Sequence, residues 1–316
     1  MNSIGGYFEL ELKKGDEYHK NAIRLNTGRN AFEYILRAKR YKRVYLPLYT
    51  CDVMLEPIKK LGLDYEFYSI DISFRPIFDF KKIKTDEAFV YNNYFGICDN
   101  QVLEVASECE NLIIDNSQSF YSSPLHGIDT FYSPRKFFGL PDGGYLYTNK
   151  KIDFPLEKDV SYNRCEHLLG RIDTNPEQHF HTYKENSRRL SNQPIREMSN
   201  LTQRLLVSID FESIARKRRF NFNYIHNDLG KRNKLKLEIS SADVPMVYLF
   251  LVDNGKLLKN QLISNKIYVA SYWPNVIKWA NSKSFEYDLA ENLLAVPIDQ
   301  RYSKNELDEI IKILKW

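Results

Sequence analysis

The sequence predicts an α/β protein, in which helices sandwich a mostly parallel β-sheet and a smaller α+β domain follows. Short apolar runs alternate with helical segments along the first half of the chain, the pattern of such a sheet. The run Leu112 to Ile114 is apolar throughout, as in a strand buried on both faces. The chain has 316 residues, and single cores stop growing near about 250–300 residues. We therefore expect a large domain at 1–205 and a small domain at 206–316.

The elements of the large domain are expected in regular alternation. Helices are predicted at 30–39, 53–61 and 102–108; apolar residues recur at helical spacing in the first, and Gly62 closes the second. Strands are predicted at 44–46, 65–70, 88–92, 112–114 and 144–147. Ligands of such sheets bind at the carboxyl ends of the strands, so the residues that follow each strand are candidates for a site.

The second half of the chain is less regular. Polar residues dominate from 153 to 194, where we expect a loop-rich connection with short helices. A long helical stretch is predicted at 198–229, a strand at 247–252, and helices at 256–265 and 304–314. These elements form the expected α+β domain.

Composition and charge narrow the class of protein. The net charge of +4 is too small to indicate nucleic acid. We interpret the basic run Arg216 to Arg219 as a solvated helix face; with Phe220 and Phe222 it leaves an RNA-binding module as an alternative. No segment is apolar for the roughly 18 residues of a membrane helix. Met1 to Gly6 has no signal-peptide pattern, and four cysteines without a CxxC pair fit the cytoplasm.

Two charged side chains are candidates for chemistry because of their positions. Asp115 follows the 112–114 strand, where its carboxylate would reach the ligand crevice; an Asp that caps the next helix is the alternative. Lys136 lies among aromatic residues, ahead of Gly143 and Gly144. Desolvation by aromatic neighbours would lower the pKa of this lysine and supply the neutral amine that a Schiff base needs. A surface lysine beside a turn is the alternative.

A third candidate feature is an anion site. Thr27, Gly28 and Arg29 precede the 30–39 helix, so their backbone N–H groups would point at a helix N-terminal anion, although a plain cap is the alternative. An acid, a lysine and an anion cradle are together the three groups that pyridoxal 5′-phosphate (PLP) requires. The acid keeps its pyridine nitrogen protonated, and the lysine holds its aldehyde.

These motifs resemble those of the DegT/StrS-type sugar aminotransferases, within the fold type I PLP enzymes. The resemblance spans about residues 23–316 and is poorest over 150–195. The matching segments are Thr27 to Arg29, Val44 to Thr50, Asn92 to Gly96, Ile114 to Gln118, Ser133 to Lys136, Asp142 to Gly144, and Leu293 to Ile298 with the helix behind it.

The resemblance implies a role for each matching residue. Lys136 would form the Schiff base and shuttle a proton, and Asp115 would pair with the pyridine nitrogen. Gln118 would lie near the 3-oxygen of the ring. The backbone N–H groups of Gly28 and Arg29 would bind the phosphate.

Three positions differ from the family pattern. Phe131 stands where a phosphate-binding serine is usual, and Ser133 is the candidate substitute, with a plain turn role as the alternative. Cys51 stands where an aromatic residue usually stacks on the ring. Tyr94 is a candidate for that stacking, as are Tyr49 and Phe95, with a place in the core as the alternative. The segment that reaches the neighbouring subunit is altered to Ile195 to Met198.

The resemblance also implies a function. It predicts a cytoplasmic homodimer that uses PLP to transfer an amino group from an amino acid to a nucleotide-linked keto sugar, in surface-polysaccharide or glycan biosynthesis. One alternative is a PLP-dependent sugar dehydratase, whose relatives carry His in place of Lys136. Another is a non-catalytic relative that binds a nucleotide sugar or acts as a scaffold. We expect no metal, because His179 and His181 lack a third ligand.

Overall fold

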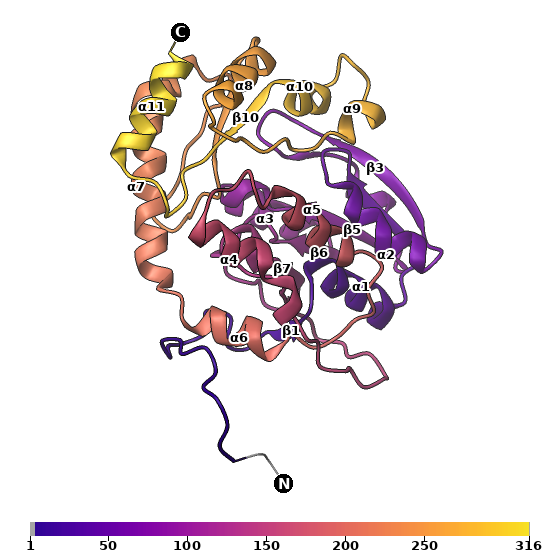
Figure 1. The fold of residues 1–316 in the computed structure, drawn as a ribbon. Coiled ribbons are helices and arrows are strands. Elements are labelled where there is room, and N and C mark those ends of the chain that lie inside the picture. The colour runs from indigo at the N-terminus through magenta and orange to yellow at the C-terminus, as the bar shows by residue number, and fades with distance from the viewer. Residues whose placement is uncertain (1–3, 316) are drawn as a thin grey trace.

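The computed structural model describes residues 4–315 and confirms the predicted α/β fold (Figure 1). The large sheet has eight strands in the order β1-β8-β7-β6-β5-β2-β3-β4. Their bounds are β1 (Ile23–Leu25), β2 (Arg43–Pro47), β3 (Asp64–Ile70), β4 (Pro76–Ile77), β5 (Glu87–Asn92), β6 (Leu112–Asp115), β7 (Asp129–Tyr132) and β8 (Gly144–Tyr147). The centre, from β3 to β7, is parallel, whereas β4, β8 and β1 join antiparallel.

Side-chain alternation along the central strands creates two hydrophobic layers. Ile113 of β6 packs with α1 (Gly28–Lys39) and α2 (Leu55–Lys60), whereas Leu112 and Ile114 face the layer that contains α3 (Asp99–Glu108). Successive residues of a strand point to opposite faces, so a strand buried on both sides must be apolar at every position. The apolar run that predicted this strand is therefore explained by burial of β6 on both faces.

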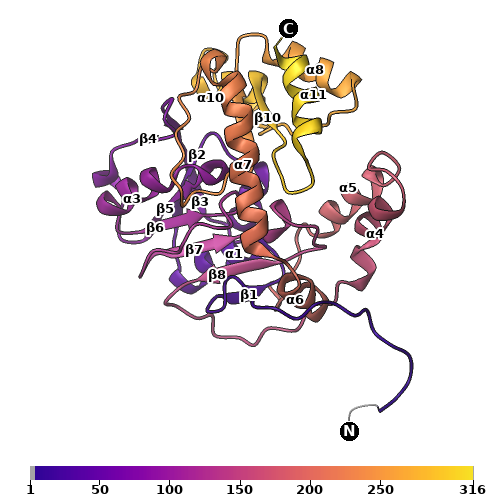
Figure 2. The ribbon, with the colours of Figure 1, turned by 90° about the vertical axis from the view of Figure 1, so that its left-hand side faces the viewer.

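The C-terminal part combines helices with a second, two-stranded antiparallel sheet. Its elements are α6 (Asn200–Val207), α7 (Phe211–Leu229), β9 (Tyr248–Leu251), α8 (Gly255–Ser264), α9 (Val276–Trp279), α10 (Phe285–Asn292), β10 (Leu293–Val296) and α11 (Lys304–Leu314). Figure 2 shows α7 running from the sheet to these elements. Residues of α7 and α11 belong to the same hydrophobic cluster as α3 and β5.

The long helical stretch predicted at 198–229 is instead two helices. Asp210 accepts a hydrogen bond from Ser213 N at 3.0 Å and caps the start of α7. No glycine or proline lies between α6 and α7, so the break had no strong sequence signal. The predicted domain boundary at 205–206 falls inside α6; the two-domain division itself stays a prediction.

The polar segment 153–194 contains the short helices that the sequence indicated. They are α4 (Glu166–Asp173) and α5 (Phe180–Arg189), which lie against one another (Figure 2). Six 3-10 turns complete the fold: η1 (Asp52–Met54), η2 (Phe80–Lys82), η3 (Tyr94–Gly96), η4 (Pro134–Lys136), η5 (Tyr162–Arg164) and η6 (Gly230–Arg232). Within residues 4–315, no helix combines the length and apolar character needed to cross a membrane.

The interpretation of the basic run on α7 is wrong at one residue. Arg216 is exposed, as expected of a solvated face, but Arg218 is buried. Phe222 is also buried, so it is not available to stack on a base as the RNA-binding alternative requires. A basic helix segment can turn one cation inward without any change in its local pattern.

Candidate active site

Asp115 and Lys136 lie at the ends of adjacent parallel strands. Asp115 is the last residue of β6, and Lys136 ends η4, the turn that follows β7. The two strands pair in parallel, with Asp115 opposite Phe131. The Lys136 charge acts on the Asp115 carboxyl and lowers its pKa, against the larger opposite effect of burial. The structure therefore brings the predicted acid and the predicted lysine to one edge of the sheet.

The Asp115 carboxyl is enclosed by protein. The residue is only 8% exposed, and its Oδ1 accepts a hydrogen bond from Ser117 N at 2.7 Å. Burial raises the pKa of Asp115 above its ordinary value, while the charge of Lys136 and the hydrogen bonds from Ser117 partly counter that effect. A carboxylate in such a place gains from a cationic partner, because its desolvation is otherwise uncompensated.

Lys136 is more exposed than the sequence predicted. Its side chain is exposed, whereas the adjoining Phe137 and Phe138 turn into the hydrophobic core. The predicted desolvation by aromatic neighbours is therefore not found in the single chain. Cys51 lies near the amine: burial raises the pKa of its thiol, and the charge of Lys136 opposes this. Residue 51, where the resemblance led us to expect an aromatic, thus lies within range of the charge of the lysine.

The segment predicted to form an anion cradle lies at the start of α1. Thr27 is the N-cap, and its Oγ1 accepts from Asn30 N at 3.0 Å. A Cβ placed on Gly28 would be 3.2 Å from Ser133 Cβ and 3.5 Å from Ser117 Oγ. Gly28 thus packs closely against two hydroxyl-bearing residues, where a side chain would be crowded. First-turn N–H groups of a helix lack intrahelical acceptors and favour an anion there.

The side chain of Arg29 turns away from the Thr27–Gly28 segment. Its Nη1 donates to Glu56 Oε2 at 2.9 Å and to Ser191 Oγ at 2.8 Å. Arg29 can therefore serve the cradle only through its backbone, as predicted. Phe131, which replaces the usual serine, points to the face of the sheet that α1 covers, where its ring stacks on Phe32 of that helix at 5.6 Å between centroids.

The segment Asp142 to Gly144 packs against the backbone at the N-terminus of α1. Gly143 N donates to Asn26 O at 2.7 Å, and a Cβ on Gly144 would be 2.5 Å from the Thr27 carbonyl carbon and oxygen. The carboxylate of Asp142 is fully buried and accepts hydrogen bonds from Thr202 and Arg164. The segment therefore fixes the N-cap of α1, which explains two adjacent glycines without assigning them chemistry.

Replacing Gly144 by alanine is expected to destabilise the protein by about 3 kcal/mol, because the new methyl group collides with backbone rather than with a flexible side chain. Thermal unfolding of the two proteins would measure this difference. Gly139→Ala is the matched control, since its Cβ would meet only Leu168 Cδ2 at an ordinary 3.8 Å. Equal stability of G144A and wild type would contradict the described contact with Thr27.

Gln118 has an unused donor in the site. Its Oε1 accepts from Phe95 N at 3.4 Å, and its Nε2 is buried without a hydrogen-bond partner among residues 4–315. An orphaned buried donor is unfavourable unless a ligand or water completes it. The position fits the predicted contact with an oxygen of a bound group.

Tyr94 is a core residue in this structure. It is 0% exposed, and its hydroxyl donates to the Tyr49 carbonyl at 2.9 Å. Its ring packs against Phe74 at 5.1 Å between centroids. The alternative of a place in the core therefore describes Tyr94 better than stacking on a cofactor.

Residues far apart in sequence complete the surroundings of the site. Arg135 Nη2 lies 3.5 Å from Ser187 Oγ of α5, and burial lowers the pKa of Arg135. Burial also raises the pKa of Tyr272, on which Tyr183 and Cys51 act as well. No local pattern predicts these contacts, because α5 and the Tyr272 segment reach the site only through tertiary folding.

Two cavities within residues 4–315 lie outside the candidate site. One of about 590 Å³ begins at Asp52, next to Cys51, and extends to Tyr65 and Trp279. Another of about 440 Å³ lies between α7 and α11. Lys136 and Asp115 line neither cavity. Across residues 4–315, no group of three or more His, Cys, Asp or Glu side chains is arranged for a metal ion.

The chain is thus an α/β protein whose mostly parallel sheet carries an acid and a lysine at adjacent strand ends, beside a helix N-terminus. Solved structures share this fold over nearly the whole chain. The sugar aminotransferase CalS13 from Micromonospora echinospora is 15% identical, with a TM-score of 0.64 over 93% of this chain and 86% of its own.

Two further structures agree. The PLP-form of the putative sugar aminotransferase Spr1654 from Streptococcus pneumoniae is 16% identical, with a TM-score of 0.66 over 93% of this chain and 86% of its own. DesV of S. venezuelae, in complex with a ketimine intermediate, is 14% identical, with a TM-score of 0.65 over 96% and 85%. No protein-family model and no curated protein matches the sequence. The chain therefore has the fold of the DegT/StrS-type sugar aminotransferases, as its motifs predicted.

Proposed function

We propose that this protein is a PLP-dependent aminotransferase that transfers an amino group from an amino acid to a nucleotide-linked keto sugar. The observation that carries the proposal is the placement of Asp115 and Lys136 at the ends of two paired strands, beside the N-terminus of α1. The sugar aminotransferases that share the fold support the class of substrate. The nucleotide link and a role in polysaccharide or glycan biosynthesis rest on the motif resemblance alone.

The residues present fit PLP at three points. The backbone of Gly28, at the N-terminus of α1, lies next to the hydroxyl-bearing Ser117 and Ser133, the kinds of donor that a phosphate needs. The enclosed Asp115 carboxylate suits a protonated pyridine nitrogen. The orphaned Nε2 of Gln118 suits an oxygen on the ring.

Each of these groups would have a distinct task. Backbone N–H groups of Gly28 and Arg29, with the Thr27 cap behind them, would bind phosphate oxygens. Asp115 would hold a proton on the pyridine nitrogen, and when bound the cofactor supplies a ring that withdraws electrons from the reacting carbon. Lys136 Nζ would accept a proton from that carbon and return it to the neighbouring one. We assign Tyr94 no direct contact and propose that it supports Tyr49 instead.

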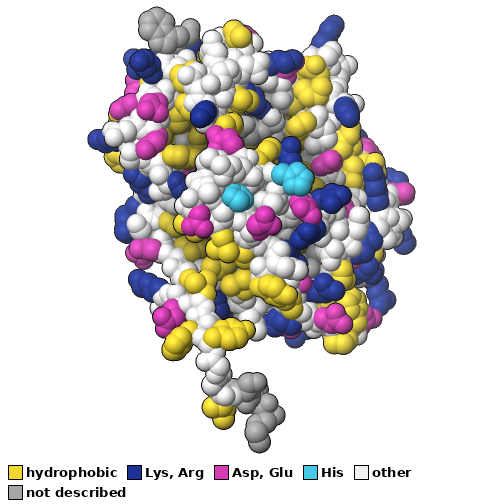
Figure 3. Space-filling view, viewed as in Figure 1, with side chains coloured by type: hydrophobic (Ala, Val, Ile, Leu, Met, Phe, Trp, Pro, Cys, Tyr) yellow, Lys and Arg dark blue, Asp and Glu magenta, His cyan; other side chains and the backbone are white. Residues whose placement is uncertain are grey.

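We also propose that a second copy of the chain closes the site. Lys136 is exposed in the single chain and lies outside the two cavities. Large apolar side chains are exposed on the face that carries α4 and α5, where Ile172 is 80% exposed (Figure 3). The N-terminal segment extends from the body with Tyr7 99% exposed (Figure 1). Apolar surface of this kind marks interfaces. Light scattering of the purified chain would test the dimer, which a monomeric mass would overturn.

The visible spectrum of the purified chain with added PLP tests the main proposal. We expect an absorbance band of lysine-bound cofactor, a borohydride-reduced adduct on the peptide that contains Lys136, and amino transfer to a keto sugar. The absence of any band would overturn the proposal and favour a non-catalytic relative that binds nucleotide sugars. Cys51 and Phe131 are the positions that favour that second candidate, because both depart from the family pattern.

A further inference from the structure

Arg218 is a buried cation that bonds the backbone at two distant places. It is 2% exposed, and its Nη1 donates to Met246 O at 2.8 Å and to Pro245 O at 3.4 Å. Its Nη2 donates to Phe137 O at 3.2 Å. Burial lowers the pKa of Arg218 to about 10, which leaves the guanidinium charged at neutral pH. A desolvated charge is costly to retain, so its bonding partners are informative.

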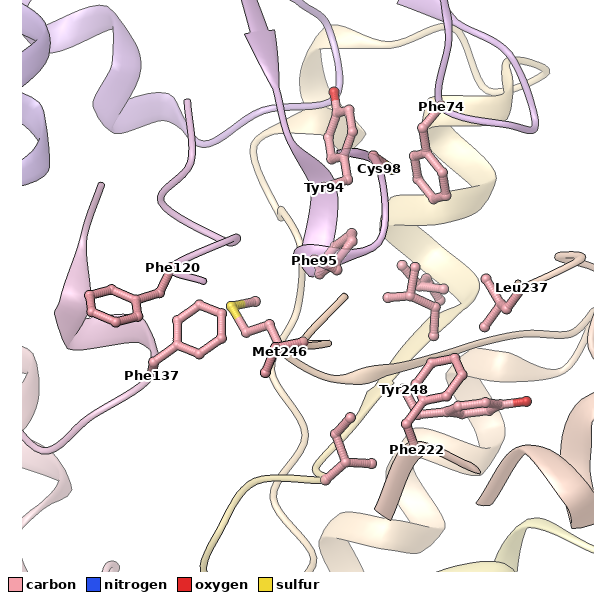
Figure 4. Close-up of a cluster of buried hydrophobic side chains, with 14 of the residues drawn as sticks. Phe74, Tyr94, Phe95, Cys98, Phe120, Phe137, Phe222, Leu237, Met246 and Tyr248 are labelled. Atoms are coloured by element: carbon pink, nitrogen blue, oxygen red, sulfur yellow. The ribbon is translucent and has the colours of Figure 1, made fainter. Parts of the chain in front are cut away.

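The Phe137 carbonyl is held from two sides. Phe137 is the residue directly after Lys136, and its oxygen also accepts from Gln300 Nε2 at 3.0 Å. The Arg218 guanidinium lies over the Phe137 ring, 4.7 Å from its centroid. Figure 4 shows this ring pointing toward Met246, whose carbonyl Arg218 also holds. Two donors satisfy both lone pairs of a carbonyl oxygen and fix its direction.

The two donors belong to one unit of the C-terminal part. Asn221, one helical turn after Arg218 on α7, donates its Nδ2 to Ile298 O at 3.0 Å, Asp299 O at 3.2 Å and Tyr302 O at 3.2 Å. These carbonyls flank Gln300. Residues three apart on a helix share a face, so one face of α7 holds both the turn that follows Lys136 and the loop that delivers Gln300.

The other restraints on the turn are its own hydrogen bonds and the packing of Phe137 and Phe138 in the core. Its local hydrogen bonds are Lys136 N to Ser133 O at 3.2 Å, and Phe137 N and Phe138 N to Pro134 O at 3.0 Å. Gly139 follows immediately and is exposed. A short 3-10 turn with weak internal geometry depends on outside contacts for a fixed position.

We propose that Arg218 and Gln300 are positioning residues, which clamp the backbone one residue beyond Lys136 and hold its amine in place beside Asp115. The importance of that placement for chemistry rests on the proposed function of Lys136. The clamp itself can be measured without a cofactor, so the failure of either idea can be recognised separately.

Amide hydrogen exchange of the full chain without cofactor tests the clamp directly. In Arg218→Met, the amides of residues 136–138 should exchange about tenfold faster, the change expected from the loss of one hydrogen bond. Gln300→Leu should accelerate the same amides to a smaller extent. Arg219→Met is the matched control, because Arg219 lies on the same helix and donates to Asp243 O and Ala242 O, away from the lysine turn.

The rate at which added PLP becomes bound to lysine supplies the second readout. We expect Arg218→Met to slow the appearance of the band by up to about 100-fold, as displacement of a reacting group does, and to shift the pH at which the band changes. Wild-type exchange rates at residues 136–138 in both R218M and Q300L, or equal acceleration in R219M, would overturn the clamp. If R218M does not fold, the exchange rates of Q300L test the clamp, because this variant removes only a neutral donor. A wild type without a band would refute the proposed function, while the exchange result would still decide the clamp.

Discussion

Lys136→Ala is expected to abolish the covalent attachment of PLP and to reduce amino transfer by at least about a thousandfold, the usual contribution of a general acid–base group. The reason is its position: Lys136 follows β7 and acts on Asp115 at the end of the paired strand β6. Spectra with PLP, followed by borohydride reduction and peptide mass mapping, would measure the loss.

Two controls make this prediction specific. Lys151→Ala removes another exposed lysine, which lies outside the described site, and should leave the band unchanged. A small primary amine added to K136A should restore part of the activity if the missing group is only a base. Retention of a reduced adduct in K136A, on any other lysine, would refute the assignment of Lys136.

Asp115→Asn should lower turnover by about 10²–10³-fold, as removal of a preorganised electrostatic group does. The same change should stabilise the protein without cofactor by about 1 kcal/mol. Both effects follow from burial, because the Asp115 carboxyl is enclosed and an asparagine oxygen can still accept from Ser117 N. The variant thus removes a buried charge while it keeps the hydrogen bond.

The difference in stability between D115N and the wild type is expected to depend on pH. Burial raises the pKa of folded Asp115, so the folded chain holds that proton more tightly than the unfolded chain. The free energy of unfolding of the wild type therefore falls as pH rises from the unfolded pKa to the raised folded pKa. The advantage of D115N should grow over that interval and stay constant above it. Urea unfolding across acidic pH would measure this, and a constant difference between the variants would contradict it.

The sequence was informative wherever function requires a residue next to a strand or helix end. Asp115, Lys136 and the Thr27 cap were predicted because strand ends and N-caps have local patterns. The parallel centre of the sheet followed from apolar runs such as 112–114.

Features that depend on tertiary packing were not predictable in this way. Arg218 belongs to a run of four basic residues, and nothing in that run distinguishes the one that turns inward. Tyr94, a candidate for stacking on the cofactor, is buried in the core, and Lys136, which was expected to be desolvated, is exposed. Ser117 was passed over because its importance depends on Gly28, which is distant along the chain.

The hydrophobic cluster that joins α3 and β5 with α7 and α11 has a consequence for how the chain unfolds. Segments that share one continuous core lose their contacts together, so they melt as one cooperative unit rather than in sequence. A fragment cut near the predicted boundary at residue 205 would expose Phe222, Ile225 and Leu229 of α7 to water. Neither half is then expected to fold alone.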